Sequence, residues 1–559
     1  MTDSILASFQ RLRAADPDRR MFTFVDDKGN DEAALTVREL GEAADRVVES
    51  LRARGFTAGD RALLVYPPGL DFIEAFLGCL AAGVIPVPVY PPNPFKLKKD
   101  LATFTAIAAN CQARGVLTNS AYDRSRTAGS VTSFFSSDSP KWPSLPWYRT
   151  DKLRATGAEV VWCQPTLDTP AFLQYTSGST STPKGVIISH GNLAYEVVAN
   201  AADLGLGPDT RGVFWLPQYH DLGLISVILS TIAGNGRTTL MSPLTFLQRP
   251  SVWFDVMSRV RATHTAAPNF AFELAVRKTT SQQRASWDLS SLRAMMSAAE
   301  PIRPATMDAF FAAFDIPRDV FFPAYGLAEH SVSVSMGGRA TLHVDKSALE
   351  SGKVVPDNTG VPYIGCGRIT KPDTVVRIVD PLSHVLCGPD EIGEIWVDSP
   401  TKGLGYWGMP EESEATFHAR IEGVDGEFLR TGDLGFFHGD ELFITGRNKD
   451  LIIVRGRNLY PADIEDSVRD CHPDIRPGGL AAFAVDTEDG EQLVLFVETR
   501  HDKANRAEIA DVVRRRIYEE HQLRCHDVVV GRQGIVRKTT SGKVRRLACR
   551  QAYLAGEAA

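Results

Sequence analysis

The sequence predicts an α/β protein with a large N-terminal domain of several subdomains built on parallel sheets, followed by a small α+β domain. Three observations support this fold class. Apolar runs typical of strands alternate with helical patterns early in the chain, short strands and turns dominate after about residue 370, and a compact α+β pattern follows residue 447. The 559 residues are too many for one hydrophobic core, so we expect two to four domains.

The first 120 residues carry a strand–helix–strand order. Thr36 followed by Glu39 is typical of a capping box, and apolar residues then recur at helical spacing. Residues 61–66 (RALLVY) and 84–89 are short apolar runs that predict buried strands, with a helix over 69–82 between them. This order predicts a parallel sheet covered by helices.

Similar alternation recurs further along, and two segments have the composition of loops. Residues 130–147 are rich in Ser and Pro, and residues 338–367 are rich in Gly, Pro and charged residues. After residue 447 we expect a helix near 462–470, strands at 480–485 and 492–498, a helix over 506–520 and a last strand near 528–536. A second domain of roughly 110 residues is the natural inference.

The composition excludes several protein classes. Hydrophobic residues make up 43% and charged residues 23%, and the net charge of −7 does not favour a nucleic-acid-binding protein. Eight cysteines are scattered without a CxxC pair, so we expect reduced thiols rather than disulfides or a zinc site. The N-terminus lacks the order of a signal peptide, and the longest apolar stretch, 75–90, is too short to span a bilayer. We therefore expect a cytoplasmic protein without a membrane span.

Residues 175–185 (YTSGSTSTPKG) predict a phosphate-binding loop. Small hydroxyl-bearing residues and glycines let the backbone approach phosphate oxygens, and Lys184 adds a positive charge. The lysine stands between Pro183 and Gly185, so this is not a Walker A loop. A flexible linker is the alternative, but a linker would not need the strand-like AFLQY before it or the apolar VIIS after it.

Six motifs, in one order over nearly the whole chain, resemble those of the adenylate-forming enzymes, which include acyl-CoA ligases, nonribosomal adenylation domains and luciferases. The motifs are YTSGSTSTPKG at 175–185, WLPQYHDLGL at 215–224, AYGLAEH at 324–330, RTGDLGF at 430–436, GRNKDLIIVRGRNLYPADIE at 446–465 and KTTSGKVRR at 538–546. The resemblance implies that ATP and Mg²⁺ activate a carboxylic acid as its acyl-adenylate, with release of pyrophosphate. It also implies an adenylation domain at 1–447 and a mobile C-terminal domain at 449–559.

The resemblance assigns roles to single residues. Lys543 corresponds to the catalytic lysine that bridges the carboxylate and the α-phosphate, where two anions meet and positive charge is needed. Asp433 and Arg447 correspond to the ribose contacts, and a carboxylate can accept hydrogen bonds from both hydroxyls. Glu329 corresponds to the catalytic and metal-binding glutamate, since Mg²⁺ prefers oxygen ligands. Lys449 occupies the hinge about which the small domain rotates between adenylation and thiolation.

The remaining implied nucleotide contacts lie in the phosphate loop and in the SAAE and AYG stretches. They are Thr176, Ser177, Gly178, Ser179, Thr180, Lys184, Ala298, Ala299, Glu300, Ala324, Tyr325 and Gly326. Tyr325 would offer a flat face for adenine, with SAAE as the opposite wall. Two alternatives stay open: Lys543 as one of six basic residues in 537–550, and Asp433 as an ordinary turn residue.

Further details resemble the fatty acyl-AMP ligases, which pass acyl chains to acyl carrier proteins. Residues 66–92 and 268–278 resemble this branch, and 342–356 (LHVDKSALESGKVVP) resembles its extra segment, which restrains rotation of the small domain. An ordinary surface loop is the alternative for 342–356. The SAAEP sequence at 297–301 agrees with the branch, whereas Arg537 stands where many members have Pro.

The branch implies a medium- or long-chain fatty acid and a carrier-protein phosphopantetheine thiol, with CoA disfavoured. Each buried methylene contributes roughly 0.8 kcal/mol, so an apolar pocket is needed. The predicted pocket residues are His220, which is also a candidate catalytic residue, Asn269, Phe270 and Phe272, although the aromatic rings could be plain core. The basic residues of 537–550 would attract an acidic carrier protein, unless they form only a solvated face. The alternatives are an acyl-CoA ligase and a non-catalytic acyl- or carrier-binding scaffold.

Overall fold

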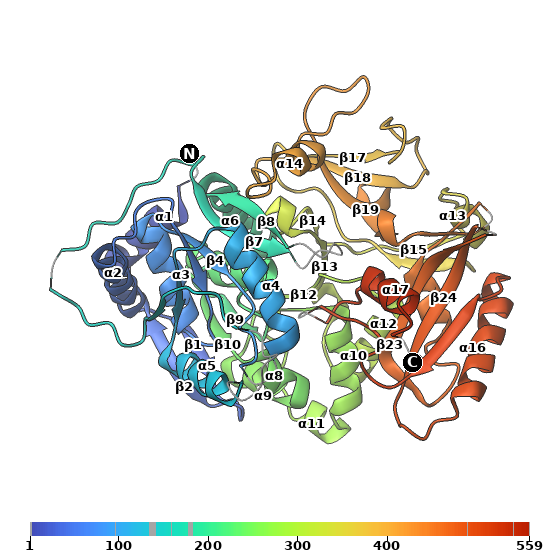
Figure 1. The fold of residues 1–559 in the computed structure, drawn as a ribbon, viewed down its shortest axis with the longest axis horizontal. Coiled ribbons are helices and arrows are strands. Elements are labelled where there is room, and N and C mark those ends of the chain that lie inside the picture. Colours follow the sequence, from blue (N-terminus) through green and yellow to red (C-terminus); the bar gives the residue numbers. More distant parts are fainter. Residues whose placement is uncertain are drawn as a thin grey trace.

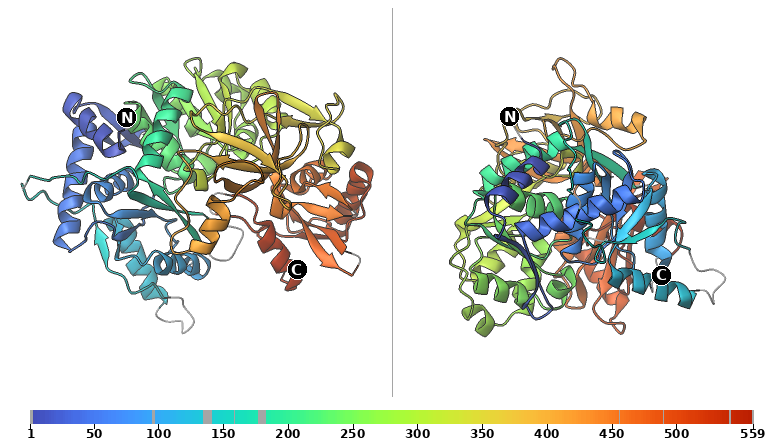
Figure 2. Two further views of the ribbon diagram at one scale, coloured as in Figure 1. Left: turned by 90° about the horizontal axis from the view of Figure 1, so that it is seen from above. Right: turned by 90° about the vertical axis from the view of Figure 1, so that its left-hand side faces the viewer.

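The computed structural model describes residues 3–94, 97–133, 141–157, 159–176, 183–454, 456–488, 490–539 and 542–557. The early part of the chain, blue to cyan, lies at one end of the molecule, and the last part, red, lies at the other (Figure 1). Two further views give the same separation (Figure 2). The predicted α/β fold class is confirmed.

An eight-stranded sheet forms the centre of the large body. Its inner pairings are parallel, and the edge strands β2 and β14 pair antiparallel. In spatial order the strands are β14 (Ser335–Met336), β13 (Phe321–Tyr325), β12 (Ala294–Ser297), β11 (His264–Ala267), β9 (Arg211–Phe214), β10 (Arg237–Leu240), β1 (Arg20–Val25) and β2 (Asp31–Thr36). The carboxyl ends of its parallel strands meet at one edge, where α/β proteins commonly bind ligands.

A second sheet, β4–β3–β5–β6, is parallel throughout and confirms the predicted strand–helix–strand order. Its strands are β3 (Arg61–Leu64), β4 (Ile85–Pro88), β5 (Gly115–Thr118) and β6 (Trp147–Arg149). Two prolines occur in β4, which is tolerated because β4 is an edge strand. An antiparallel hairpin, β7 (Pro170–Thr176) and β8 (Lys184–Ser189), packs beside β4 and brings the ends of the predicted phosphate loop together.

An antiparallel sheet follows, with strands β17 (Val375–Val379), β18 (Gly393–Asp398), β19 (Leu429–His438) and β20 (Glu441–Arg447). Ahead of it, β15 (Thr341–Val344) pairs with β16 (Val361–Ile364), and α13 (Lys346–Glu350) lies between them in sequence. The prediction of a loop over 338–367 is therefore wrong for much of that segment. Asp345 caps α13 by accepting a 2.8 Å hydrogen bond from the Ala348 amide. An Asp at this position is a local signal for the start of a helix, but the Gly and Pro content of the segment favoured the prediction of a loop.

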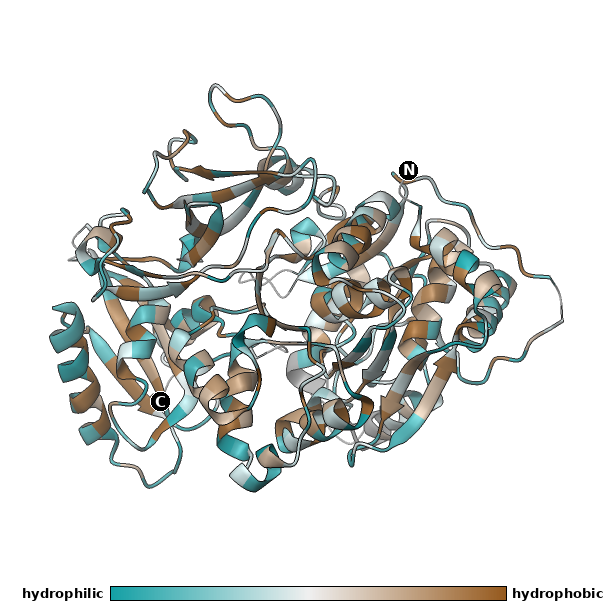
Figure 3. Ribbon diagram, turned by 180° about the vertical axis from the view of Figure 1, so that it is seen from behind, coloured by the Kyte–Doolittle hydropathy of each residue, from teal (hydrophilic) through white to brown (hydrophobic). Residues whose placement is uncertain are grey.

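The C-terminal unit has the predicted α+β pattern and its own core. Its hairpin is β21 (Ile452–Val454) with β22 (Arg457–Leu459), and its sheet is β23 (Ile475–Thr487), β24 (Gly490–Thr499) and β25 (Asp527–Gly531). The helices are α15 (Pro461–Val468), α16 (Arg506–His521) and α17 (Arg546–Leu554). Hydrophilic residues dominate the outer helix α16, while the neighbouring strands are hydrophobic (Figure 3).

Helices cover the sheets of the large body. Apart from those already given, the α-helices are α1 (Ile5–Ala15), α2 (Val37–Ala53), α3 (Asp71–Ala82), α4 (Leu97–Asn110), α5 (Ser120–Ser133), α6 (His190–Leu204), α7 (Ser230–Ala233), α8 (Pro243–Gln248), α9 (Ser251–Val260), α10 (Asn269–Lys278), α11 (Ser281–Ala285), α12 (Pro304–Ala313) and α14 (Pro410–Phe417). Short 3₁₀ turns are η2 (Arg318–Val320), η3 (Ala328–His330) and η4 (Asn448–Asp450). No helix in the described ranges has both the length and the hydrophobicity that a transmembrane segment needs.

Local sequence signals explain several helix boundaries. The predicted capping box is confirmed: Thr36 Oγ1 accepts from the Glu39 amide, and the Glu39 carboxylate accepts from the Thr36 amide at 2.8 Å. Helix α5 runs to Ser133 and β6 begins at Trp147, so the loop predicted over 130–147 begins later than expected. Within that loop, residues 134–140 lie outside the described ranges. After Asp221 the chain forms a π-helix, η1 (Leu222–Leu229), a wider form that is uncommon at this length.

All eight cysteines carry free thiols. Desolvation raises the pKa of Cys366 to about 12 and that of Cys111 to about 11. The same cause raises the pKa of each of the other six thiols above its usual value: Cys79, Cys163, Cys387, Cys471, Cys525 and Cys549. The thiols are therefore protonated at neutral pH.

A completely buried ion pair joins α6 to the segment that leads into β17. Lys371 Nζ lies 2.5 Å from Glu196 Oε2, and the two side chains are 1% and 0% exposed. The Ser333 amide donates to Glu196 Oε1 at 3.2 Å, and Lys371 also donates to the Ser333 carbonyl. Both charges are thus satisfied inside the protein, and the pair fixes the chain that follows η3.

Replacing Lys371 by Met should strongly destabilise the protein. The variant leaves Glu196 buried without its partner, which costs about 3–5 kcal/mol in free energy of unfolding. Chemical denaturation would measure this loss. Arg38→Met is the matched control, because its pair with Asp18 is 50% and 83% exposed and should contribute less than about 1 kcal/mol. Equal losses in the two variants would contradict the assigned importance of the buried pair.

Candidate active site

The predicted ribose-binding residues meet where β19 and β20 pair. Asp433 and Arg447 are opposite each other in the strand register, and Arg447 Nε lies 3.1 Å from Asp433 Oδ1. Tyr325, at the end of β13, donates from its hydroxyl to Asp433 Oδ2 at 2.8 Å. Asp433 is only 7% exposed, and its charge is the main cause of the raised pKa of Arg447. The result is an oriented carboxylate held by Tyr325 and Arg447.

Tyr325 and Gly326 are held by close packing. The Tyr325 ring is buried, and the hydroxyl contact with Asp433 directs it toward the ribose-binding pair. A Cβ atom on Gly326 would lie 1.7 Å from the Val332 carbonyl oxygen, so only glycine fits there. Ala324 precedes them on β13 and is 7% exposed. Whether the Tyr325 ring stacks on adenine stays a prediction.

Glu329 lies on η3 next to a tyrosine that the sequence reasoning did not single out. Tyr406 donates from its hydroxyl to Glu329 Oε1 at 3.0 Å, and Lys184 Nζ lies 4.8 Å from the centre of the Tyr406 ring. Desolvation raises the pKa of Glu329. Tyr406 lies in the GYWGMP stretch that precedes RTGDLGF. The motif could be recognised in the sequence, but the contact of Tyr406 with Glu329 could not.

The residues around Glu329 suit a metal ion that is shared with phosphate groups. Within the described ranges, no three or more His, Cys, Asp or Glu residues gather as a ligand set. Mg²⁺ is commonly held by one or two carboxylates together with substrate phosphates and water, rather than by an all-protein cage. Glu329, near Lys184, fits this type of site.

Lys543 belongs to the C-terminal unit, and charges of the large body act on it. The Thr539 amide donates to the Lys543 carbonyl at 2.8 Å, and Gly542 has a φ of 89°, so the backbone turns tightly before the lysine. Desolvation lowers the pKa of Lys543, whereas the charges of Asp221 and Asp433 act to raise it. The charges of the large body thus act on the Lys543 ammonium group.

His220 and Asp221 stand at the start of η1. Asp221 accepts a 2.7 Å hydrogen bond from the Leu222 amide and so caps the helix. Among the described residues, His220 Nε2 has no hydrogen-bond partner although it is buried. Desolvation, with Lys543 nearby, lowers the pKa of His220. The imidazole is therefore neutral at physiological pH.

The predicted acyl-pocket residues on α10 have different environments. Phe270 is partly buried, and its ring centre lies 6.0 Å from that of Trp215, which stacks on Phe246. Phe272 is 0% exposed and packs against Phe310, so the structure describes it as a core residue. Asn269 accepts a 3.0 Å hydrogen bond from the Arg303 amide and ties α10 to α12. Contact of these residues with a substrate stays a prediction.

The SAAE stretch follows β12 directly. Ala299 has a φ of 74°, which is unusual for a residue with a side chain, and Ala298 is 8% exposed. The Glu300 carboxylate accepts a hydrogen bond from the Phe270 amide in the first turn of α10. Glu300 thus links the predicted adenine wall to the helix of the predicted acyl pocket.

The remaining predicted site residues are placed only in part. Thr176 pairs with Lys184 across the β7–β8 hairpin, so both ends of the phosphate loop are defined. Ser177, Gly178, Ser179 and Thr180 lie outside the described residues. Lys449 lies on η4 between the two units, and desolvation lowers its pKa.

Comparison with known proteins identifies the family of the chain. The AMP-binding enzyme family model matches residues 9–407, and the model described as the Disco-interacting protein 2-like AMP domain matches 449–559. The chain is 39% identical to the medium-chain-fatty-acid–[acyl-carrier-protein] ligase JamA of Moorena producens, over 96% of this chain and 93% of JamA. It is 38% identical to the putative fatty-acid–CoA ligase FadD21 of Mycobacterium tuberculosis, over 99% and 98% of the two chains.

A solved structure shows the same fold. The fatty acyl-adenylate ligase from L. pneumophila, in complex with acyl adenylate and pyrophosphate, aligns with a TM-score of 0.74 and 34% identity, covering 99% of this chain and 96% of its own. The family match covers most of the chain, and the identities extend over almost its full length. The chain therefore belongs to the AMP-binding enzyme family and, within it, to the fatty acyl-AMP ligases.

Proposed function

We propose that this protein uses ATP and Mg²⁺ to activate a medium- or long-chain fatty acid as its acyl-adenylate and then transfers the acyl group to the phosphopantetheine thiol of an acyl carrier protein. The observation that carries the proposal is the cluster of Asp433, Arg447 and Tyr325, which are joined by an ion pair and a hydrogen bond, with the charge of Asp433 acting on Lys543 of the C-terminal unit. These groups supply the charges that a nucleotide and a carboxylate need in one cleft.

In the first half-reaction, a fatty-acid carboxylate oxygen attacks the α-phosphorus, and the bond to the bridging oxygen of pyrophosphate breaks. The Lys543 ammonium neutralises charge that develops between the two anions. Asp433 and Arg447 orient the ribose. Lys184 stands at the C-terminal end of the phosphate loop. Glu329 would hold Mg²⁺, which screens the phosphate charge when it is bound.

His220 has a different role in the first half-reaction. Its neutral imidazole stands beside Asp221 at the start of η1, where it can line the carboxylate end of the acyl site without adding charge. Tyr406 donates to Glu329 and so positions that carboxylate toward Lys184. The Lys184 ammonium above the Tyr406 ring gains a cation–π contact that orients both side chains.

In the second half-reaction, the carrier-protein thiolate attacks the acyl carbonyl carbon and AMP leaves. We propose that the C-terminal unit, residues 449–559, rotates near Lys449 between the two half-reactions. Arg537, Lys538 and Arg545 supply positive charge beside Lys543, which favours the approach of an acidic carrier protein. JamA, named as an acyl-carrier-protein ligase, supports this acceptor.

The 342–356 segment bridges the large body and the C-terminal unit. Arg457 forms a bidentate pair with Glu350 on α13, with both N–O distances at 2.8 Å. Lys346 donates to the Glu520 carbonyl at the end of α16. Val344, Leu349 and Val354 share a hydrophobic cluster with Tyr460 of the C-terminal unit. These contacts support a segment that restrains rotation and disfavours CoA as the acceptor.

Two alternatives make different predictions. An acyl-CoA ligase, the activity in the name of FadD21, would form a CoA thioester from fatty acid, ATP and CoA. A non-catalytic scaffold would give no pyrophosphate exchange with any fatty acid. Mass spectrometry of products formed with either CoA or a carrier protein separates the proposed function from both.

Lys543→Ala should reduce fatty-acid-dependent ATP–pyrophosphate exchange by roughly 10²–10³-fold, because the variant removes a charge that stabilises the transition state. Acyl transfer from presynthesised acyl-adenylate to the carrier protein should be much less affected. Arg532→Ala is the control, since this arginine is mostly exposed and pairs with Asp502. Normal exchange by Lys543→Ala would refute the assigned role.

Tyr325→Phe should raise the KM for ATP about tenfold and leave the KM for the fatty acid nearly unchanged. The variant removes the hydroxyl that donates to Asp433, a hydrogen bond to a charged group whose loss costs about 1.5–3 kcal/mol. Tyr195→Phe is the matched control, because Tyr195 donates to the exposed Pro372 carbonyl away from the cleft. An unchanged KM for ATP would contradict the role of Tyr325 in orienting Asp433.

Glu350→Gln should increase CoA thioester formation relative to carrier-protein loading, since it weakens the tether to Arg457. Removal of residues 342–356 should have a larger effect in the same direction. Asp357→Asn serves as the control, because within the described residues the Asp357 carboxylate accepts only from the amide and hydroxyl of the nearby Thr359. If neither Glu350→Gln nor the deletion forms more CoA thioester, the segment does not govern acceptor choice.

A further inference from the structure

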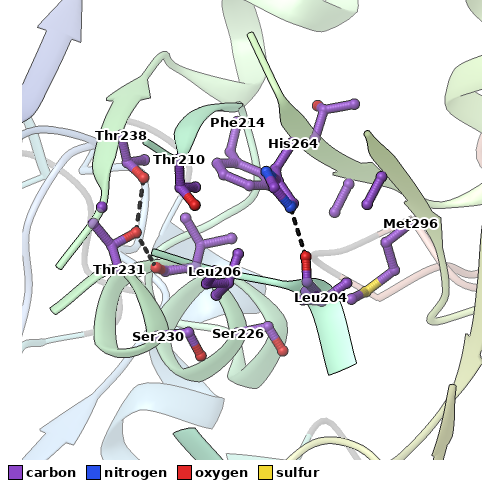
Figure 4. Close-up of a pocket in the computed structure, with 15 residues that line it drawn as sticks. Leu204, Leu206, Thr210, Phe214, Ser226, Ser230, Thr231, Thr238, His264 and Met296 are labelled. Atoms are coloured by element: carbon purple, nitrogen blue, oxygen red, sulfur yellow. Dashed lines mark hydrogen bonds between the residues drawn. The ribbon is translucent and has the colours of Figure 1, made fainter. Parts of the chain in front are cut away.

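Charged side chains gather where the C-terminal unit meets the large body, and not around the cavity inside the large body. That cavity, of about 30 Å³, lies between η1 and the eight-stranded sheet, and no Asp, Glu, Lys or Arg occurs among the described residues that line it (Figure 4). Helices α10 and α12 lie at the border with the C-terminal unit (Figure 1), and ion pairs connect both of them with α15. The border is therefore the place where charge can govern how the two units sit together.

Arg303 and Asp466 form the first of these pairs. Arg303 is the N-cap residue of α12, and its Nε donates to Asp466 Oδ2 of α15 at 2.9 Å. Both side chains are partly buried, so the pair is partly shielded from water. The Arg303 amide also donates to Asn269 Oδ1 of α10 at 3.0 Å. The arginine thus extends from a backbone that is itself anchored in the large body.

Arg469 and Glu273 form the second pair, with the charges reversed. Arg469 follows α15 directly, and its Nη2 donates to Glu273 Oε2 of α10 at 2.6 Å. Asp466 and Arg469 are three residues apart, a spacing that places both on one side of a helix. The large body offers one cation and one anion, and α15 offers the complementary anion and cation. An orientation that exchanged the partners would bring like charges together.

The residue before Asp466 connects α15 with the segment that carries Lys543. Glu465 is buried, and both of its carboxylate oxygens accept from Arg546 Nη2 at 2.8 Å. Glu465 Oε1 also accepts from the Ala482 amide of β23 at 2.9 Å. Arg546 stands three residues after Lys543. Lys543 is thereby tied to α15, and α15 is tied to the large body.

The partners of α15 in the large body lie beside the predicted adenine wall. Glu300 of the SAAE stretch accepts from the Phe270 amide in the first turn of α10, the helix that carries Glu273. Arg303 follows Glu300 by three residues. The two ion pairs thus set α15, and with it Lys543, against segments that we expect to hold the nucleotide.

We infer that Arg303 and Glu273 are positioning residues for Lys543. Their pairs with Asp466 and Arg469 hold the C-terminal unit in the orientation that presents Lys543 for acyl-adenylate formation, and both pairs open when the unit rotates for acyl transfer. The inference rests on the proposed function, and it adds contacts that are separate from those of α13. Because the pairs favour one orientation, their loss should slow the first half-reaction and spare the second.

Reversal and exchange of the charges test this inference. Asp466→Arg brings two cations together and Arg303→Asp brings two anions together, so each single variant should lower fatty-acid-dependent ATP–pyrophosphate exchange by at least about tenfold. Acyl transfer from presynthesised acyl-adenylate to the carrier protein should stay within about twofold of the wild-type rate. The double variant Arg303→Asp/Asp466→Arg restores an attractive pair and should return pyrophosphate exchange to within about threefold of the wild-type rate.

Glu273→Arg, Arg469→Glu and their double variant repeat the test at the second pair, and thermal unfolding shows whether each variant is folded. Arg318→Asp is the matched control, because Arg318 pairs with Asp308 of α12 within the large body and both side chains are exposed. It should leave exchange within about twofold of the wild-type rate. Limited chymotrypsin cleavage at Leu451, next to η4, gives a measurement that does not depend on catalysis. Cleavage should be faster in the single reversals than in the wild-type protein and the double variants.

Three results would overturn the inference. They are single reversals that leave exchange unaltered, an equal loss in both half-reactions, and double variants that are as slow as the slower of their single variants. Absence of exchange by the wild-type protein with any fatty acid would refute the proposed function instead. Chymotrypsin cleavage would then decide on the two ion pairs, and equal cleavage rates in all variants would refute them.

Discussion

The buried pair of Lys371 and Glu196 is the constraint on which the active-site geometry depends. It binds together α6, the turn after η3 and the segment that leads into β17. These three segments are far apart in the sequence. His330, next to Glu329, donates from Nδ1 to the Ser333 carbonyl, which also accepts from Lys371. The buried charges thus help to fix the backbone that follows Glu329.

Around this fixed frame, the cleft is assembled from residues that are remote in sequence. Tyr406 reaches Glu329, Tyr325 reaches Asp433, and Lys543 enters from a unit with its own core. The carboxylates of the large body attract the Lys543 ammonium in the structure described here. Binding of a nucleotide would add further negative charge, which suits the adenylation half-reaction that we propose.

The sequence supplied candidate site residues, whose roles stay predictions, but not the tertiary contacts that connect them. Lys184, Glu329, Asp433, Arg447 and Lys543 occur in short motifs whose residue types suit the chemistry, and the strand–helix–strand order of the first sheet follows from local apolar runs. The Tyr406 contact was not predictable, because it joins positions 77 residues apart through tertiary packing. The sequence did not predict helix α13, because the Gly and Pro residues around it suggested a loop. The wide turn of η1 has no local sequence signature that would predict it.

The raised pKa of all eight cysteine thiols has a consequence for an enzyme that makes an acyl-adenylate. A mixed anhydride of this kind reacts readily with thiolates, and a protein rich in ionised cysteines would acylate itself. Here burial keeps the thiols protonated and four of them inaccessible: Cys79, Cys111, Cys366 and Cys549. The activated acyl group is therefore preserved for a nucleophile that arrives from outside the chain.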